Sequence, residues 1–356
     1  MKIELSKRYM KDNLISFISI TNKNNFKVVL CSLGACIYSI YAKNKEGVFE
    51  NVIMTPKKDE DFLDTEAYYG KIIGRTSGRI SDASFELDGE RYNITSNRPN
   101  DVVLHGGEEK FSDMIYEYEV YEEKDKAYVI FYGFSRDGAA GYPGEINFRI
   151  TYTVYENEDD VLIDYYATTT KKTVLNLTNH AYFNLSGNFK RSILEHELLI
   201  KASRFVDIDE DLLPICIRNV NEVMDFRYGK RVGMDIESPS LQNHAFKGYD
   251  HPWIFDDQNY NICNVCLIDP ISFRQVEVYT TYPCVVIYSN NYPSGNEMID
   301  KETLDEKYDA ICLECQFVPN GINVDNGEEK AILDVGEEYH HMTRYSFRVK
   351  EINYYE

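Results

Sequence analysis

The stretch FRITYTVYENEDDVLIDYYATT, residues 148–169, decides the fold class of this chain. In its first half every second residue is apolar: Phe148, Ile150, Tyr152 and Val154. After an acidic turn at 156–160 the alternation resumes with Val161, Ile163 and Tyr165. A period of two with one apolar face is typical of a half-buried strand, so this stretch predicts a β-hairpin.

The same pattern extends along the chain. The composition includes 29 Tyr and 18 Phe, and aromatic and β-branched residues favour strands. Further strands are predicted at 27–41, 84–94, 127–134, 173–185, 196–206, 262–268, 274–290, 310–318 and 343–350. No Pro/Gly/Ser-rich linker separates them. We therefore expect an all-β fold, a large antiparallel β-sandwich, as a single domain over 1–356.

Charge and hydropathy exclude several functions. The net charge of −21 repels phosphate backbones and anionic lipid, so we expect no nucleic acid and no membrane as partner. The first twenty residues contain no apolar signal region, and no stretch approaches the roughly 18 apolar residues that span a bilayer. We expect a cytoplasmic protein that is a monomer or a homodimer.

The eight cysteines raise the question of zinc. Two pairs have C-x-x-C spacing: Cys263 with Cys266, and Cys312 with Cys315. Four thiolates could hold zinc, but both pairs lie in predicted strands, where an odd separation sends the side chains to opposite faces. We therefore predict buried free thiols. His340-His341 has the same difficulty, since neighbours on a strand point apart, and we expect no metal.

The segment VLNLTNHAYFNL at 174–185 separates into two faces. One face is apolar except for Asn179: Leu175, Leu177, Ala181, Phe183 and Leu185. The other is a row of mostly polar residues: Val174, Asn176, Thr178, His180, Tyr182 and Asn184. Such a row suits the floor of a wet cleft. The alternative is a solvated sheet face, in which Lys, Glu and Thr would be the more usual residues.

Glu314 stands on the less apolar face of the predicted strand 310–318. A carboxylate in a mostly buried strand is costly unless it is paired or hydrated, so a functional or ion-paired role is indicated. Three further polar residues lie at loop ends: His105, Arg79 and Asp250. Each has a structural alternative, as a turn histidine, a surface ion-pair partner and a turn cap respectively.

Ten motifs occur in a fixed order along the chain. They are GRTSGRI at 74–80, VVLHGG at 102–107, GYPG at 141–144, NLTNHAYFNLSG at 176–187, DEDLLP at 209–214, GYDH at 248–251, VYTTYP at 278–283, LECQ at 313–316, PNGIN at 319–323 and GEEY at 336–339. In these motifs the sequence resembles the aldose 1-epimerase (galactose mutarotase) family, from about residue 30 to 348.

The resemblance implies a two-sheet β-sandwich with its site on a concave face. It implies that Glu314 is the general base and His180 the general acid of a cofactor-free enzyme. This enzyme would interconvert the α and β anomers of a free aldohexose, such as galactose or glucose, by ring opening and reclosure. It also implies that Arg79, His105 and Asp250 bind the sugar and that Tyr182 lines the pocket.

Three departures from the family pattern concern the substrate-reading residues. Gly78 stands where many members have an Asn, Val286 where some have a Gln, and Ala139-Ala140 where acidic residues are common. The residues are also compatible with two other functions. One is a glycoside hydrolase that uses Asp250 and Glu314. The other is a sugar-binding protein without activity.

Overall fold

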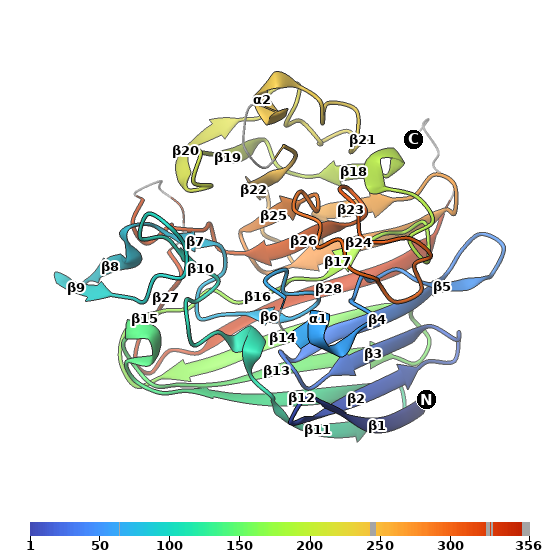
Figure 1. Ribbon diagram of the computed structural model, residues 1–356, viewed down its shortest axis with the longest axis horizontal. Helices are drawn as coiled ribbons and strands as arrows, with labels where there is room; N and C mark the ends of the chain where they lie inside the picture. Colours follow the sequence, from blue (N-terminus) through green and yellow to red (C-terminus); the bar gives the residue numbers. More distant parts are fainter. Residues whose placement is uncertain (64, 243–246, 325–327, 329, 351–356) are drawn as a thin grey trace.

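The computed structural model describes residues 1–63, 65–242, 247–324, 328 and 330–350. Within these ranges most strands belong to three sheets of nine, six and five strands, in which hydrogen-bonded neighbours are antiparallel (Figure 1). The two helices, α1 at Asp59–Leu63 and α2 at Pro239–Gln242, are short. No helix among the described residues is both long and apolar enough to traverse a bilayer.

The nine-stranded sheet contains the hairpin from which the fold was predicted. In spatial order its strands are β11 Glu117–Glu122, β12 Lys126–Ser135, β13 Ile146–Tyr155, β14 Asp160–Thr169, β28 Tyr339–Val349, β24 Arg274–Thr280, β23 Val265–Ile268, β18 Glu197–Ile200 and β21 Lys230–Arg231. β13 and β14 pair from Ile146 with Thr169 to Val154 with Val161, which confirms the hairpin.

The six-stranded sheet faces the nine-stranded one. Its strands are β17 Tyr182–Phe183, β26 Ile311–Gln316, β25 Cys284–Tyr288, β22 Asp250–Ile254, β19 Arg204–Ile208 and β20 Pro214–Asn219. The ring of Phe183 on β17 contacts Tyr345 on β28 at 5.1 Å between centroids. The Tyr345 hydroxyl donates a hydrogen bond to the Leu313 carbonyl at 3.3 Å. These contacts cross the core between the two sheets, and the predicted antiparallel β-sandwich is confirmed.

The five-stranded sheet is formed by the N-terminal part of the chain and packs on the same core. Its strands are β1 Lys2–Met10, β2 Asn13–Thr21, β3 Lys27–Cys31, β4 Cys36–Lys43 and β5 Phe49–Asn51. Four small ribbons complete the fold: β6 Ile72–Ile73 with β16 Thr178–Asn179, β7 Arg79–Ile80 with β10 Val103–Leu104, β8 Ser84–Leu87 with β9 Glu90–Asn93, and β15 Thr173–Val174 with β27 Ile332–Leu333.

The prediction of one continuous strand at 173–185 is wrong. The segment forms three two-residue strands, because its polar side chains bond the backbones of neighbouring segments. Asn176 donates to the Phe317 carbonyl at 3.1 Å, and the Thr178 hydroxyl donates to the Cys315 carbonyl at 2.8 Å. Asn184 donates to two further carbonyl groups. The alternation of faces survives, since the predicted apolar residues lie in the main core.

The prediction of buried free thiols is correct for six of the eight cysteines, whereas Cys216 and Cys263 are half-buried. All eight cysteines are free thiols. Cys312 and Cys315 lie in β26 and pack in two different apolar clusters, on opposite faces as expected. Cys266 lies in β23, but Cys263 precedes that strand, so the argument from alternation does not apply to it.

Candidate active site

A cavity of about 470 Å³ opens on the face of the six-stranded sheet that points away from the core. Strand register explains which side chains reach it. Glu314 on β26 lies opposite Val286 on β25, which lies opposite Pro252 on β22. Two residues along the same strands, Tyr288 and Asp250 are also cross-strand partners. Since side chains alternate across a strand, all five project into the cavity.

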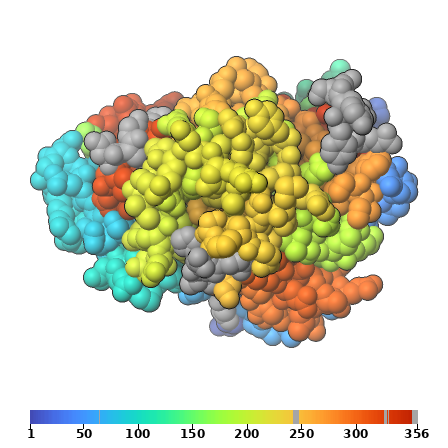
Figure 2. All heavy atoms as spheres, turned by 90° about the horizontal axis from the view of Figure 1, so that it is seen from above, coloured from blue at the N-terminus to red at the C-terminus, as the bar shows by residue number. Residues whose placement is uncertain are grey.

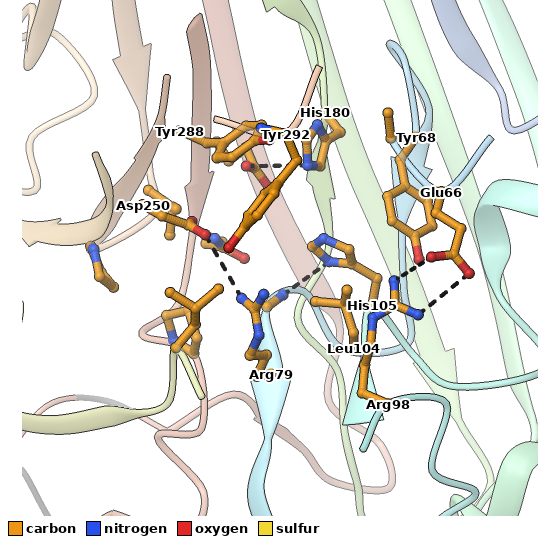
Figure 3. Close-up of a pocket in the computed structure, with 18 of the residues that line it drawn as sticks. Glu66, Tyr68, Arg79, Arg98, Leu104, His105, His180, Asp250, Tyr288 and Tyr292 are labelled. Atoms are coloured by element: carbon orange, nitrogen blue, oxygen red, sulfur yellow. Dashed lines mark hydrogen bonds and ion pairs between the residues drawn. The ribbon is translucent and has the colours of Figure 1, made fainter. Parts of the chain in front are cut away.

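The segment around 204–240 covers this end of the molecule (Figures 1 and 2). Ile208, Leu212 and Pro214 from this segment form an apolar wall of the cavity. Tyr292 lies near Asp250 (Figure 3), and its N–H donates to the Tyr288 hydroxyl at 3.1 Å.

The backbone of His180 is fixed on both sides. Its N–H donates to the Lys71 carbonyl and its carbonyl accepts from the Gly70 N–H, each at 2.9 Å. The imidazole is buried and stacks on Tyr182, with 5.1 Å between ring centroids and 28° between planes. The short strands on either side of His180 therefore place its ring on the cavity floor rather than in solvent.

His180 and Glu314 are in contact. Nε2 of His180 lies 3.5 Å from Oε1 of Glu314. Burial raises the pKa of Glu314 well above its usual range, with Asp250 acting in the same direction and Arg79 against it. Burial lowers the pKa of His180 to about 4. Burial therefore favours the uncharged form of each group, so the two groups compete for a proton across this short contact.

Arg79 and Asp250 form the second charged pair. Nη1 of Arg79 lies 4.0 Å from Oδ2 of Asp250 across the cavity (Figure 3). Burial raises the pKa of Asp250, and the Arg79 guanidinium opposes that shift. Arg79 comes from β7, whose partner strand β10 leads directly into His105.

His105 is placed as a neutral donor. Its Nδ1 accepts a hydrogen bond from the Gly78 N–H at 3.2 Å, so the proton of the neutral ring is on Nε2. Burial lowers its pKa well below the usual value, and the charge of His180 adds to this shift. The two imidazoles meet edge to face at 5.4 Å between centroids.

All six residues predicted for the site line this one cavity: Glu314, His180, Arg79, His105, Tyr182 and Asp250. The predicted polar cleft floor is correct only in part. His180 and Tyr182 line the cavity, whereas Asn176, Thr178 and Asn184 are buried and bonded to backbone groups.

Sequence reasoning missed three contributors to the site. Tyr68 has a left-handed backbone, with φ of 55°, and its ring lies 4.7 Å from that of His105. Its buried hydroxyl has no hydrogen-bond partner among the described residues. Arg98 and Glu66 form an ion pair of 3.1 Å at the cavity edge. Nothing in the sequence around Tyr68 and Tyr69 predicted that Tyr68 lies at the cavity.

Three possible metal ligands lie close together in the site. The donor atoms of His180, Cys312 and Glu314 are within 4.8 Å of one another. However, Sγ of Cys312 approaches Nδ1 of the imidazole, while Glu314 approaches Nε2. A metal ion takes one nitrogen of a ring, so this arrangement does not present all three donors to one ion. The absence of a metal stays a prediction.

Comparisons with known proteins agree on one family. The family model described as aldose 1-epimerase matches residues 16–346. A galactose mutarotase of Mus musculus is 32% identical over 327 residues, which cover 92% of each chain. An aldose 1-epimerase of Haemophilus influenzae is 30% identical over 335 residues, which cover 93% of this chain and 95% of the relative.

Two solved structures share the fold of this chain. A crystal structure of galactose 1-epimerase from Lactobacillus acidophilus superposes with a TM-score of 0.84 over 98% of each chain, at 24% identity. An aldose epimerase homologue from C. elegans gives a TM-score of 0.82 over 94% of this chain and 98% of its own, also at 24% identity.

Proposed function

This chain belongs to the aldose 1-epimerase family, and we propose that it interconverts the α and β anomers of a free aldohexose such as galactose or glucose. The predicted family and enzyme class are confirmed by the match over 16–346 and by the two named relatives. The observation that supports the reaction best is the contact between His180 and Glu314 on the cavity floor.

In the proposed mechanism Glu314 removes the proton of the C1 hydroxyl while His180 protonates the ring oxygen. The C1–O5 bond breaks and leaves a free aldehyde. Rotation about C1–C2 presents the other face of the carbonyl, and the reverse transfers close the ring. The step starts from the form in which Glu314 is ionised and Nε2 of His180 carries a proton. Because the pair then takes one proton and gives one, its total proton count is unchanged.

The remaining polar residues orient the sugar. Arg79 and the Nε2–H of His105 are donors, and Asp250 is an acceptor when it is ionised. Tyr182 supports the imidazole from below. The residues of the site supply the acid, the base and the orientation that ring opening needs, so we propose a reaction without metal or cofactor.

We also propose that the protein works in the cytoplasm, as a monomer or homodimer, and binds neither nucleic acid nor a membrane surface. The free state of all eight thiols is consistent with a reducing compartment, and the net charge of −21 disfavours polyanions.

Polarimetry tests the reaction directly. Freshly dissolved α-galactose and α-glucose should reach anomeric equilibrium faster with purified protein than in buffer. Glu314→Gln should lower the enzymatic rate by about 10²-fold or more, because it removes the base. Glu86→Gln, at an exposed position on β8 that does not line the cavity, is the matched control and should retain the rate. Equilibration of every common aldose at the buffer rate would refute the proposal.

A further inference from the structure

We propose that Cys312 is a positioning residue, which accepts the Nδ1–H of His180 and so leaves Nε2 as the atom that exchanges the proton. The inference rests on the proposed function only in giving His180 that proton transfer. The contact and the tautomer are properties of the protein without substrate.

The thiol of Cys312 lies beside the buried imidazole of His180. Sγ of Cys312 is 3.5 Å from Nδ1 of His180, within hydrogen-bonding distance for sulfur, and both side chains are buried. In β26 Cys312 pairs with Tyr182 on one side and with Tyr288 on the other. The rings of both tyrosines contact His180, at 5.1 and 6.3 Å between centroids. The imidazole is thus bounded by two aromatic rings with the small thiol between them.

The two nitrogens of His180 have different neighbours. Nε2 is 3.5 Å from Glu314, at the cavity, whereas Nδ1 turns to Cys312. A neutral imidazole has one N–H and one lone pair. For Nε2 to accept a proton and return it, the resident proton must stay on Nδ1, and a buried N–H is costly without an acceptor. Sulfur in the observed place meets that need.

A neutral thiol can orient the imidazole of His180 without stabilising its protonated form. A carboxylate beside Nδ1 would stabilise the imidazolium and make His180 a weaker acid. Burial raises the pKa of the Cys312 thiol well above its usual range, with Glu314 and Asp250 acting in the same direction, so the sulfur stays uncharged. A neutral, weak acceptor therefore fixes the orientation of His180 while its acidity is retained.

The chain offers a matched control for the test. Cys315 lies in the same strand and is equally buried, but it packs in the core on the opposite face. Cys312→Ala and Cys315→Ala remove the same sulfur from the same strand, and only the first removes the contact with His180. Cys312→Ser keeps an acceptor at nearly the same place.

Two measurements decide the proposal. Long-range ¹⁵N-¹H NMR of histidine-labelled protein should show His180 as the Nδ1–H tautomer in wild type, Cys312→Ser and Cys315→Ala, and a mixture of tautomers in Cys312→Ala. Polarimetry should show kcat lowered by about 2- to 10-fold in Cys312→Ala with KM unchanged, and largely restored in Cys312→Ser. Cys315→Ala should retain kcat.

An Nε2–H tautomer in the wild type would overturn the proposal. So would a Cys312→Ala protein that keeps the Nδ1–H tautomer and the wild-type kcat, since another group would then hold the ring. If the wild type lacks mutarotase activity, the proposed function fails, while the NMR result still decides whether Cys312 sets the tautomer. If Cys312→Ala does not fold, the tautomer in the wild type and in Cys312→Ser remains decisive.

Discussion

At the scale of single residues, the site keeps two ionisable groups where water is scarce. Burial shifts the pKa of Glu314 upward and that of His180 downward, so each group is more stable in its uncharged form. Such opposed shifts allow an acid and a base to work side by side near neutral pH, and they also make the stability of the protein depend on pH.

The sign of that dependence follows from each shift. The raised pKa of Glu314 gives stability that is present at low pH and is lost as pH rises through the pKa of the folded state. The lowered pKa of His180, about 4, acts in the opposite direction. Its contribution is present above about pH 6.5 and is lost as pH falls toward 4.

We expect Glu314→Gln to be inactive and yet more stable than the wild type at pH 8, because the amide has no charge to bury. At pH 4.5 the difference between the two proteins should shrink, because the wild-type carboxyl is then protonated. Urea unfolding of both proteins at the two pH values measures this change. A difference in the free energy of unfolding that is the same at both pH values would contradict the expected burial of Glu314.

The alternating pattern drew attention to these two residues, and the family resemblance implied their roles as acid and base. Glu314 interrupts the apolar run of β26, and His180 stands in a row of otherwise uncharged polar residues. Tyr68 could not be found in this way, since its position depends on a left-handed backbone and on contacts with His105, 37 residues later in the chain. The contact of Cys312 with His180 likewise depends on packing between segments.

At the scale of elements, the three strands β26, β25 and β22 supply the side chains that lie beside Glu314 in the cavity. Glu314, Val286 and Pro252 form a cross-strand row, and cross-strand partners have Cβ atoms about 5 Å apart. If the C1 hydroxyl binds at Glu314 as we propose, we expect the substituent at C2 to lie near Val286 and Pro252. Gly78 has no side-chain amide, and an Asn at this position would clash, because its Cβ would lie 2.6 Å from the Pro319 side chain.

We therefore expect the wild type to discriminate weakly between an aldohexose and its 2-deoxy analogue. Val286→Gln places donors and an acceptor in the row and should raise the preference for the 2-hydroxyl sugar by about 2- to 10-fold in kcat/KM. Polarimetry with glucose and 2-deoxyglucose measures the ratio, and Val286→Leu is the apolar control. A ratio that Val286→Gln leaves unchanged would show that C2 lies elsewhere in the cavity.

Strands were predicted correctly where they pair with a neighbour in sequence. The prediction was wrong where the partner lies far along the chain. The hairpin at 148–169 was found with its turn and its faces, because β13 and β14 are adjacent in sequence and pair with each other. The segment at 173–185 has the same alternation, but its hydrogen-bond partners lie in distant segments, including residues 70–76 and 311–317. An alternating pattern shows which face is buried, and it does not show which segment supplies the backbone partner.

At the scale of the whole molecule, the three sheets share one core. A single apolar cluster includes residues from Ile18 in β2 to Phe347 in β28. Phe26 contacts Phe347 at 5.3 Å between centroids, and the Tyr152 hydroxyl donates to the Ala35 carbonyl at 2.6 Å. The N-terminal sheet therefore packs on the nine-stranded sheet, which in turn packs on the sheet that holds the site.

This continuity supports our proposal that residues 1–356 form one domain, and it predicts one cooperative unfolding transition. The only tryptophan, Trp253, is fully buried in β22 and reports on the sheet of the site, whereas far-ultraviolet circular dichroism reports on all strands. The two signals should give the same midpoint in guanidinium chloride, because the three sheets share one core and none keeps it complete when another unfolds. A tryptophan transition clearly separated from the loss of strand signal would instead show two units that unfold independently, and would contradict the single domain.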